Sequence, residues 1–479
     1  MKVLYAAAEA VPFAKSGGLG DVAGALPAAL RKRLVGCRVV LPFYQDTPKA
    51  LKEQMTLLGE MWVPLSWRSQ YCGIYEAKVG NVIYYLLDNK YYFGRKGYYG
   101  YYDDGERFAF FSKAVLELLQ HIDFKPDVIN CNDWQTGLIP FYLNKFYRNA
   151  GDVYANLKVV YTIHNIQYQG VFAPSIVENV LGVEWNEYAG GYLQFDNCVN
   201  YMKTGIEAAD WITTVSPTYA QEIQTPEYGH KLDSMLKQES QKLSGILNGI
   251  DTEKFNPETD PALFCNYSLE NLEGKKACKK GLQEMLGLTV RDDVPIVAVV
   301  SRLADHKGLD LIAHVFDEML GDDMQFVVLG VGEWRYEEMM KKAAIAYPGK
   351  VSVNLRFDAD LAQKIYSGAD ILLMPSQSEP CGLSQLIAMR YGTIPVVRET
   401  GGLKDTVQPY VSWEGRGNGF SFAAYNAHDM LYVIRQAEET FHNPENWKQV
   451  MTNAMKTDVS WNGPAKDYLA LYRKITGKK

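Results

Sequence analysis

The sequence lacks the features that mark a membrane or secreted protein. No stretch approaches the roughly 20 uninterrupted apolar residues of a membrane-spanning helix. Met1 to Glu9 has the pattern of a β-strand, without the charged start, apolar core and cleavage site of a secretory signal. The seven cysteines are odd in number and have no paired spacing, which argues against a disulfide framework or a zinc site. We therefore expect a cytoplasmic protein with free thiols.

The chain also lacks a large net charge of either sign. Lys and Arg number 49 and Asp and Glu number 56, so the net charge is −7. This mildly acidic balance disfavours a binder of nucleic acid or of anionic membranes. The 479 residues, 47% apolar and 22% charged, allow two or three domains and exclude wholesale disorder. Tyrosine is abundant, with 32 residues, and its flat ring with a polar edge suits sugars and nucleobases as well as ordinary packing.

Short apolar runs alternate with helical patterns in both halves of the chain. Strands are expected at 3–8, 37–41, 82–87, 128–131, 159–163, 211–215, 296–301, 326–329, 351–355, 371–375 and 394–397. Helices are expected at 22–34, 107–120, 137–146, 308–320, 334–346, 360–367 and 382–390. Buried strands that alternate with helices predict parallel sheets covered on both faces. We expect an α/β fold of two doubly wound domains, with ligands at the carboxyl ends of the strands and in the cleft between the domains.

Three strand ends in the first half carry candidate chemistry. Lys15 to Asp21 (Lys-Ser-Gly-Gly-Leu-Gly-Asp) joins a strand to a helix, where backbone N–H groups and Lys15 could hold an anion and Asp21 could cap the helix. Its spacing fits neither a Walker loop nor a dinucleotide fingerprint. Asp133 and His164 end two further strands. Each has a purely structural explanation: a tight turn for the glycine loop, a helix cap for Asp133 and a structural role for His164. However, one parallel sheet would place all three features at the same edge.

The second half repeats this arrangement. Arg302 and Lys307 lie on a loop between a strand and a helix, where they could converge on a diphosphate or could be two solvated loop cations. Glu379 precedes another helix start, where it could hold sugar hydroxyls beside a phosphate bound by backbone N–H groups, or could simply favour the helix end. Residues 399–403 contain a further pair of glycines after a strand, and an ordinary turn without a binding role is their simplest explanation.

Asn89 to Tyr102 interleaves aromatic, glycine and basic residues. Such a segment could form a stacking surface for sugars or for single-stranded nucleic acid, or could pack on itself with several buried tyrosines. The net negative charge of the chain makes binding of nucleic acid the least favoured of these three interpretations.

Together these segments resemble the glucan synthases of glycosyltransferase family 5, which include the bacterial glycogen synthases and the plant starch synthases. The resemblance spans the chain. Its motifs lie at Lys15–Leu19, His164–Gly170, Asn248–Asp251, Ser301–Leu303 with Lys307-Gly308, Glu379–Leu383, Thr400–Leu403, Ser460-Trp461 and Tyr468–Tyr472.

The resemblance implies a GT-B architecture. Residues 1–246 would form the acceptor-side domain, 247–256 a linker, 257–456 the domain that binds the nucleotide sugar, and 457–479 a helix that crosses back to the first domain. The implied reaction is retaining transfer of glucose from ADP-glucose to the 4-hydroxyl at the non-reducing end of an α-1,4-glucan. UDP-glucose as donor, or a non-catalytic glucan-binding protein, are the alternatives. No cofactor is implied and the oligomeric state stays open.

The resemblance also assigns site residues. The catalytic set would be Glu379, Asp133, His164, Arg302 and Lys307. Donor binding would use Lys15, Gly17, Gly18, Asn248, Phe357, Cys381, Gly382, Leu383, Ser384, Thr400 and Gly401. Acceptor binding would use Asp21, Trp134, Tyr91, Tyr92, Gln167 and Tyr168.

The chain departs from the pattern of its relatives at several positions. Gln135 stands where many relatives carry His, and Phe357 where relatives often carry Tyr, which would keep stacking on adenine but lose a hydroxyl. Ile387 stands where a neighbouring family of retaining transferases has a second Glu. Asp358-Ala359-Asp360 is expected to begin a helix and not to bind a metal. A nicotinamide dehydrogenase is disfavoured, because neither half combines the glycine fingerprint with a later acidic residue.

Overall fold

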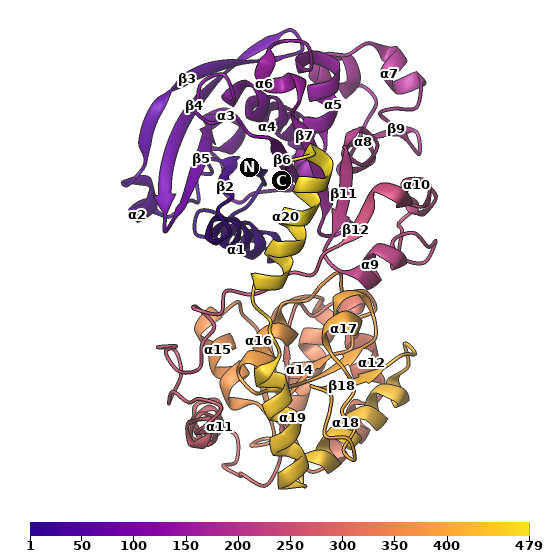
Figure 1. Cartoon of the computed structure of the whole chain (residues 1–479). Helices are drawn as coiled ribbons and strands as arrows, with labels where there is room; N and C mark the ends of the chain where they lie inside the picture. Colours follow the sequence, from indigo (N-terminus) through magenta and orange to yellow (C-terminus); the bar gives the residue numbers. More distant parts are fainter. Residues whose placement is uncertain (479) are drawn as a thin grey trace. The chain divides into compact units, whose positions relative to one another are not determined.

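The computed structural model describes residues 1–478, which form two units (Figure 1). Unit 1 comprises Met1–Gly249 and residues 461–478, and unit 2 comprises Ile250–Ser460. Of the expected linker, residues 247–249 belong to unit 1 and 250–256 to unit 2. The N–H of Ile250 donates to the Val459 carbonyl at 2.8 Å, so the two ends of unit 2 are tied together.

Unit 1 is built on a nine-stranded sheet in the order β12-β11-β7-β6-β1-β2-β5-β4-β3. Its strands are β1 (Lys2–Ala6), β2 (Gly36–Pro42), β3 (Thr56–Leu65), β4 (Arg68–Val79), β5 (Val82–Asp88), β6 (Val128–Asn132), β7 (Lys158–Ile163), β11 (Trp211–Thr214) and β12 (Leu243–Gly245). The seven strands from β12 to β5 are parallel. Six of them were predicted as strands of a parallel sheet, and β12 was not predicted. The antiparallel strands β3 and β4 were not predicted, because β3 alternates between exposed and buried residues in its second half and β4 is only partly buried, unlike the continuous apolar runs of the parallel strands.

The helices of unit 1 cover this sheet. Their bounds are α1 (Gly18–Lys32), α2 (Lys49–Lys52), α3 (Lys90–Phe93), α4 (Asp104–Leu118), α5 (Leu138–Tyr142), α6 (Asp152–Ala155), α7 (Trp185–Ala189), α8 (Tyr201–Ala208), α9 (Pro217–Glu222), α10 (Asp233–Gln238) and α20 (Asn462–Thr476). The short turns η1 (Trp134–Thr136), η2 (Leu143–Tyr147), η3 (Val177–Leu181) and η4 (Ser240–Lys242) connect several of them. A small second sheet has the order β8-β10-β9, with β8 (Val171–Phe172), β9 (Gln194–Phe195) and β10 (Cys198–Asn200).

The start of α1 corrects one prediction. The helix begins at Gly18, with Gly17 at the N-cap and no side-chain cap. Asp21 lies within the first turn, where its negative charge suits the helix dipole, so it does not cap the helix.

Unit 2 is built on a six-stranded parallel sheet in the order β15-β14-β13-β16-β17-β18. The strands are β13 (Ile296–Val300), β14 (Gln325–Leu329), β15 (Val351–Asn354), β16 (Ile371–Met374), β17 (Ile394–Arg398) and β18 (Phe420–Phe422). The helices are α11 (Glu273–Leu286), α12 (Leu309–His314), α13 (Phe316–Gly321), α14 (Trp334–Ala346), α15 (Ala359–Gly368), α16 (Ser384–Arg390), α17 (Gly401–Thr406), α18 (Ala427–Phe441) and α19 (Pro444–Lys456), with the turn η5 (Asp305–Lys307). The single helix expected at 308–320 is two helices, broken at Val315. Buried apolar side chains from strands and helices form one large core cluster in this unit, with a small separate cluster of Val397, Leu403 and Val407.

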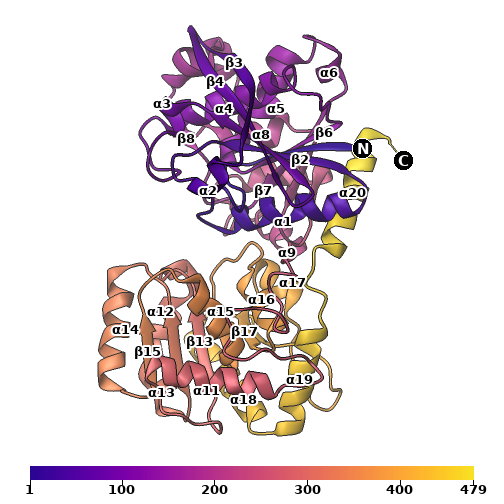
Figure 2. The ribbon, with the colours of Figure 1, turned by 90° about the vertical axis from the view of Figure 1, so that its left-hand side faces the viewer.

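A buried polar row connects the C-terminal helix to the sheet of unit 1. Figures 1 and 2 both show α20 beside α1. The Tyr472 hydroxyl on α20 donates to Asn130 Oδ1 at 2.8 Å, and Asn130 Nδ2 donates to Thr162 Oγ1 at 2.8 Å. Buried polar groups of this kind stabilise a fold only while each has its partner.

Tyr472→Phe tests this row. Removing the hydroxyl leaves the buried Asn130 oxygen without a donor. We therefore expect the free energy of unfolding, measured by scanning calorimetry, to fall by about 1 kcal/mol. Tyr432→Phe, which changes an exposed hydroxyl on α18, is the matched control and should leave the transition unchanged. Equal stability of the two variants would contradict a stabilising role for the row.

Candidate active site

The glycine loop of unit 1 is bound by a carboxylate of its own chain. Glu9, only 3% exposed, follows β1. Its Oε1 accepts from Ser16 Oγ at 2.7 Å and from the Tyr99 hydroxyl at 2.5 Å, while its Oε2 accepts the backbone N–H groups of Ser16 and Gly17. Sequence reasoning missed Glu9, although a carboxylate at the end of an apolar run was a usable signal. Because Gly17 N–H is already paired, this loop offers fewer free donors to an anion than the sequence predicted.

Lys15 and Asp21 lie on the same loop and form an ion pair at 2.7 Å. The sequence assigned Lys15 to the donor and Asp21 to the acceptor. Both side chains are partly exposed, so the pair is accessible to solvent and to a substrate group. Its own contribution to stability is small, as for other solvent-exposed pairs.

Asp133 and His164 meet at the carboxyl ends of β6 and β7. Asp133 Oδ1 accepts the backbone N–H groups of His164 at 2.7 Å and of Asn165 at 3.3 Å. Asp133 has a φ of 55°, a conformation that costs free energy for a residue other than glycine and that clusters at functional sites. The predicted proximity of Asp133 and His164 is thus confirmed.

Burial sets the protonation of both side chains. It raises the pKa of Asp133 to about 7, against the opposing effect of the two N–H donors. It lowers the pKa of His164 to about 3, so the imidazole is neutral near pH 7. His164 can therefore exchange hydrogen bonds with a substrate but does not supply a positive charge.

A groove of about 630 Å³ lies beside these residues in unit 1. Three predicted acceptor residues line it, Trp134, Gln167 and Tyr168. The Trp134 ring packs against the rings of Phe108 and Phe172, with ring centroids 5.0 and 5.8 Å apart. An aromatic wall beside amide and hydroxyl groups suits a sugar, which has both apolar faces and polar edges.

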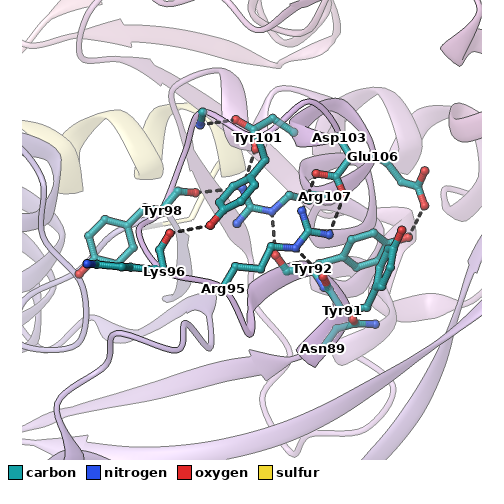
Figure 3. Close-up of polar contacts among 12 residues, drawn as sticks. Asn89, Tyr91, Tyr92, Arg95, Lys96, Tyr98, Tyr101, Asp103, Glu106 and Arg107 are labelled. Atoms are coloured by element: carbon teal, nitrogen blue, oxygen red, sulfur yellow. Dashed lines mark hydrogen bonds and ion pairs between the residues drawn. The ribbon is translucent and has the colours of Figure 1, made fainter.

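The segment rich in tyrosine packs on itself and on the start of α4 (Figure 3). Tyr92 is fully buried and donates to Glu106 Oε1 at 2.5 Å, so its ring offers no face to a glucan, which corrects its predicted role. Tyr91 is 61% exposed, with the Arg95 guanidinium 5.2 Å from its ring centroid. Arg95 also forms a bidentate ion pair with Asp103, at 2.6 and 2.7 Å, which joins this segment to the residue before α4.

A second and smaller cavity, of about 180 Å³, lies in unit 2 at the carboxyl ends of β13 and β16. Lys307 Nζ and Glu379 Oε2 are 2.6 Å apart at its wall, and Ser376 Oγ donates to the same carboxylate oxygen at 3.1 Å. Glu379 is only 8% exposed. The cavity is lined by three residues of the predicted catalytic set, Arg302, Lys307 and Glu379, and by three predicted donor-binding residues, Gly382, Leu383 and Ser384.

The other predicted donor residues of unit 2 have different surroundings. Cys381 and Thr400 are buried and do not line the cavity. Gly401, at a φ of +43°, packs against the Glu379 loop: a Cβ there would lie 2.0 Å from the Glu379 carbonyl oxygen. Phe357 is 87% exposed on the loop that follows β15.

Three residues outside the cavities complete the comparison with the sequence. Asn248, in unit 1, is buried with its Oδ1 unpaired. Gln135 is buried as well, and its Oε1 also lacks a partner. Asp358 caps α15 by accepting the Leu361 N–H at 2.9 Å, so the predicted helix start is confirmed. Within residues 1–478, no group of three or more His, Cys, Asp or Glu side chains is placed to hold a metal ion, and none of the helices is both long and apolar enough to span a bilayer.

Known proteins match the chain over its whole length. The family model of the starch synthase catalytic domain matches residues 2–238, and that of glycosyl transferases group 1 matches residues 287–453. Glycogen synthase of Geobacillus thermodenitrificans is 51% identical over 479 residues, which are 100% of this chain and 99% of that protein. The chain belongs to the glycogen and starch synthase family.

Further relatives agree with this family and its fold. Glycogen synthase of Desulforamulus reducens is 51% identical over 476 residues, 99% of each chain. The catalytic domain of starch synthase IV from Arabidopsis thaliana, solved with bound ADP and acarbose, matches with a TM-score of 0.92 at 32% identity and covers 99% of each chain. The predicted fold class, two doubly wound domains of GT-B type, is confirmed.

The raised pKa of Asp133 predicts a pH effect on stability. An unfolded Asp titrates near 3.9, so the folded chain holds this proton to higher pH. Its ionisation therefore costs stability progressively as pH rises from about 4 through about 7. Asp133→Asn keeps an acceptor oxygen and has no charge. Its Tm relative to the wild type should be higher at about pH 8 than at about pH 5; a Tm difference that is constant or falls with pH would contradict the shift.

Gly401→Ala should disturb the position of Glu379. Its Cβ would overlap the Glu379 carbonyl oxygen, so the loop must move, and displacements of this size cost up to ~10²-fold in rate. Gly463→Ala, on α20 with no atom within 4 Å of the new Cβ, is the control. Transferase assays should show a loss only for Gly401→Ala; equal activity of both variants would show that the loop can shift without affecting the site.

Proposed function

We propose that the chain is a glucan synthase that transfers glucose, with retention, from ADP-glucose to the non-reducing 4-hydroxyl of an α-1,4-glucan. The observation that carries this proposal is the cavity in unit 2, where Arg302, Lys307 and Glu379 converge. The family membership supports the reaction class, and the ADP in the structure of starch synthase IV supports adenine as the base. The free thiols of the chain are compatible with a reducing compartment, and we propose the cytoplasm.

The cavity of unit 2 fits the donor. The leaving diphosphate gains negative charge in the transition state, which preorganised cations stabilise best in a partly buried site. Lys307 has three N–H donors, so it can hold Glu379 and a phosphate oxygen together. Arg302 adds a forked donor, and the backbone N–H groups that begin at Gly382 add neutral ones.

Glu379 acts on the sugar in this proposal. Its carboxylate would orient glucose hydroxyls and offset the positive charge that develops at the glucosyl carbon. Phe357 would stack on the base, and its high exposure leaves both ring faces open. No covalent nucleophile is assigned, so attack on the same face as the leaving phosphate accounts for retention.

Unit 1 carries the proposed acceptor chemistry. The aromatic groove with Trp134, Gln167 and Tyr168 would hold the glucan chain. Neutral His164 and the adjacent Asp133 would orient hydroxyls through hydrogen bonds. Lys15 and Asp21 are the charged pair available at the neighbouring glycine loop.

Incorporation of radiolabelled glucose into glycogen tests the function. We expect transfer from ADP-glucose to exceed transfer from UDP-glucose, with the label released by an exo-acting α-1,4-glucosidase. Preference for UDP-glucose would overturn the proposed base. Glucan binding without transfer from either donor would favour the non-catalytic alternative.

Glu379→Gln separates catalysis from stability. The variant keeps the size of the side chain and loses its charge, so we expect a near-normal Tm with turnover lower by ~10²-fold. Glu338→Gln breaks a similar carboxylate–lysine pair, with Lys341 at 2.7 Å on the surface of α14, and should keep full turnover. A Glu379→Gln enzyme that melts several degrees lower yet turns over normally would reduce Glu379 to a structural role.

The proposed chemistry uses side-chain cations in place of a metal. Addition of EDTA should therefore leave the initial rate of glucose transfer unchanged, because Arg302 and Lys307 compensate the diphosphate. Complete loss of activity that magnesium or manganese restores would refute this assignment.

A further inference from the structure

The ring of His164 is held by a residue to which neither the motifs nor the proposed reaction assigns a role. Asn132 is the last residue of β6, and His164 follows β7, its neighbour in the sheet. Asn132 Oδ1 lies 2.8 Å from His164 Nε2. Asn132 is fully buried, so this contact is protected from water.

Two backbone carbonyls fix the orientation of the Asn132 amide. Its Nδ2 donates to the Ala6 carbonyl at 2.9 Å and to the Asn130 carbonyl at 3.1 Å. Both N–H bonds of the amide are thereby used. The opposite orientation would place the amide oxygen against two carbonyl oxygens, which cannot donate to it. Oδ1 is therefore the atom that faces His164.

The contact selects one tautomer of the imidazole. An amide oxygen only accepts, so His164 Nε2 must carry the proton that joins them. The other ring nitrogen, Nδ1, is then an acceptor in the neutral ring. Among residues 1–478, Nε2 is the ring nitrogen of His164 that has a protein partner.

We propose that Asn132 is a positioning residue that fixes His164 as its Nε2–H tautomer and so presents Nδ1 as an acceptor to a hydroxyl donor of the substrate. The hydrogen bond from a substrate hydroxyl to Nδ1 rests on the proposed function. The assignment of the Nε2–H tautomer does not. The Ala6 carbonyl takes part indirectly, because it holds the Asn132 amide at the end of β1.

The neighbouring Asn130 provides a matched control. It lies two residues earlier on β6, is equally buried, and makes two side-chain hydrogen bonds, to Thr162 and Tyr472. None of its side-chain contacts involves His164. Asn130→Leu therefore reports the general cost of losing a buried amide on this strand, and Asn132→Leu adds the loss of the His164 contact.

The first experiment uses the wild-type chain labelled with ¹⁵N-histidine. At neutral pH, two-bond ¹H–¹⁵N correlation should show His164 with a protonated Nε2 and an unprotonated Nδ1, its signals assigned by their absence in His164→Gln. A protonated Nδ1, alone or together with Nε2, would overturn the proposal. This spectrum needs no Asn132 variant, so the test survives if Asn132→Leu fails to fold.

The second experiment compares Asn132→Leu with Asn130→Leu. In Asn132→Leu the two nitrogen shifts of His164 should approach each other, because the acceptor that selects one tautomer is gone. Turnover should fall by ~10- to 100-fold with little change in the KM for the donor, as expected when a reacting group is misplaced. Asn130→Leu should keep the wild-type shifts and turnover. Wild-type shifts and turnover in Asn132→Leu, or equal losses in both variants, would refute the positioning role. If the wild type transferred no glucose, the proposed function would fail while the shifts still decided the tautomer.

Discussion

The ion pair between Lys307 and Glu379 is the contact on which the candidate site of unit 2 depends. It joins the loop after β13 to the loop after β16 at 2.6 Å. Either charge alone would be costly in so buried a place, and the pair relieves that cost. A glycine permits these two loops to come this close: Gly308 lies against the Pro375 carbonyl, where a Cβ would be 2.1 Å from the oxygen. A second glycine, Gly401 after β17, lies as close to the Glu379 carbonyl. The charge pair and the close approach at these glycines together fix the walls of the cavity in unit 2.

Unit 1 also brings its candidate residues together at the ends of parallel strands, but with a different balance of charge. Parallel strands bring Glu9, Asp133 and His164 to one sheet edge, from β1, β6 and β7. Here most polar atoms are already paired within the chain: Glu9 with the glycine loop, and Asp133 with two backbone N–H groups. The ring of His164 is neutral because it is buried. Unit 1 therefore offers oriented hydrogen bonds and an aromatic wall, which suit a neutral sugar, while unit 2 offers positive charge, which suits a diphosphate.

The sequence predicted what depends on local pattern. The parallel strands from 296 to 397 and their helices were recognised because continuous apolar runs alternate with helical periodicity. The candidate site residues at the strand ends followed from the same topology. The antiparallel pair β3 and β4 was missed, since partial burial gives a weaker signal than a continuous apolar run. Asp21 was misplaced because α1 begins at Gly18, about one turn earlier than predicted. The roles of Tyr92 and Asn132 depend on side-chain contacts that no local pattern reveals, whereas Glu9 had a usable local signal.

The central claim is that the loops after β13 and β16 form one nucleotide site, preorganised by Lys307 and Glu379. Hydrogen exchange of the full chain, followed by mass spectrometry with and without saturating ADP, tests it most directly. The account predicts that ADP slows exchange in both 301–308 and 376–384, the two segments that flank the cavity. Unchanged exchange in both segments at saturating ADP, or protection confined to other parts of the chain, would contradict it.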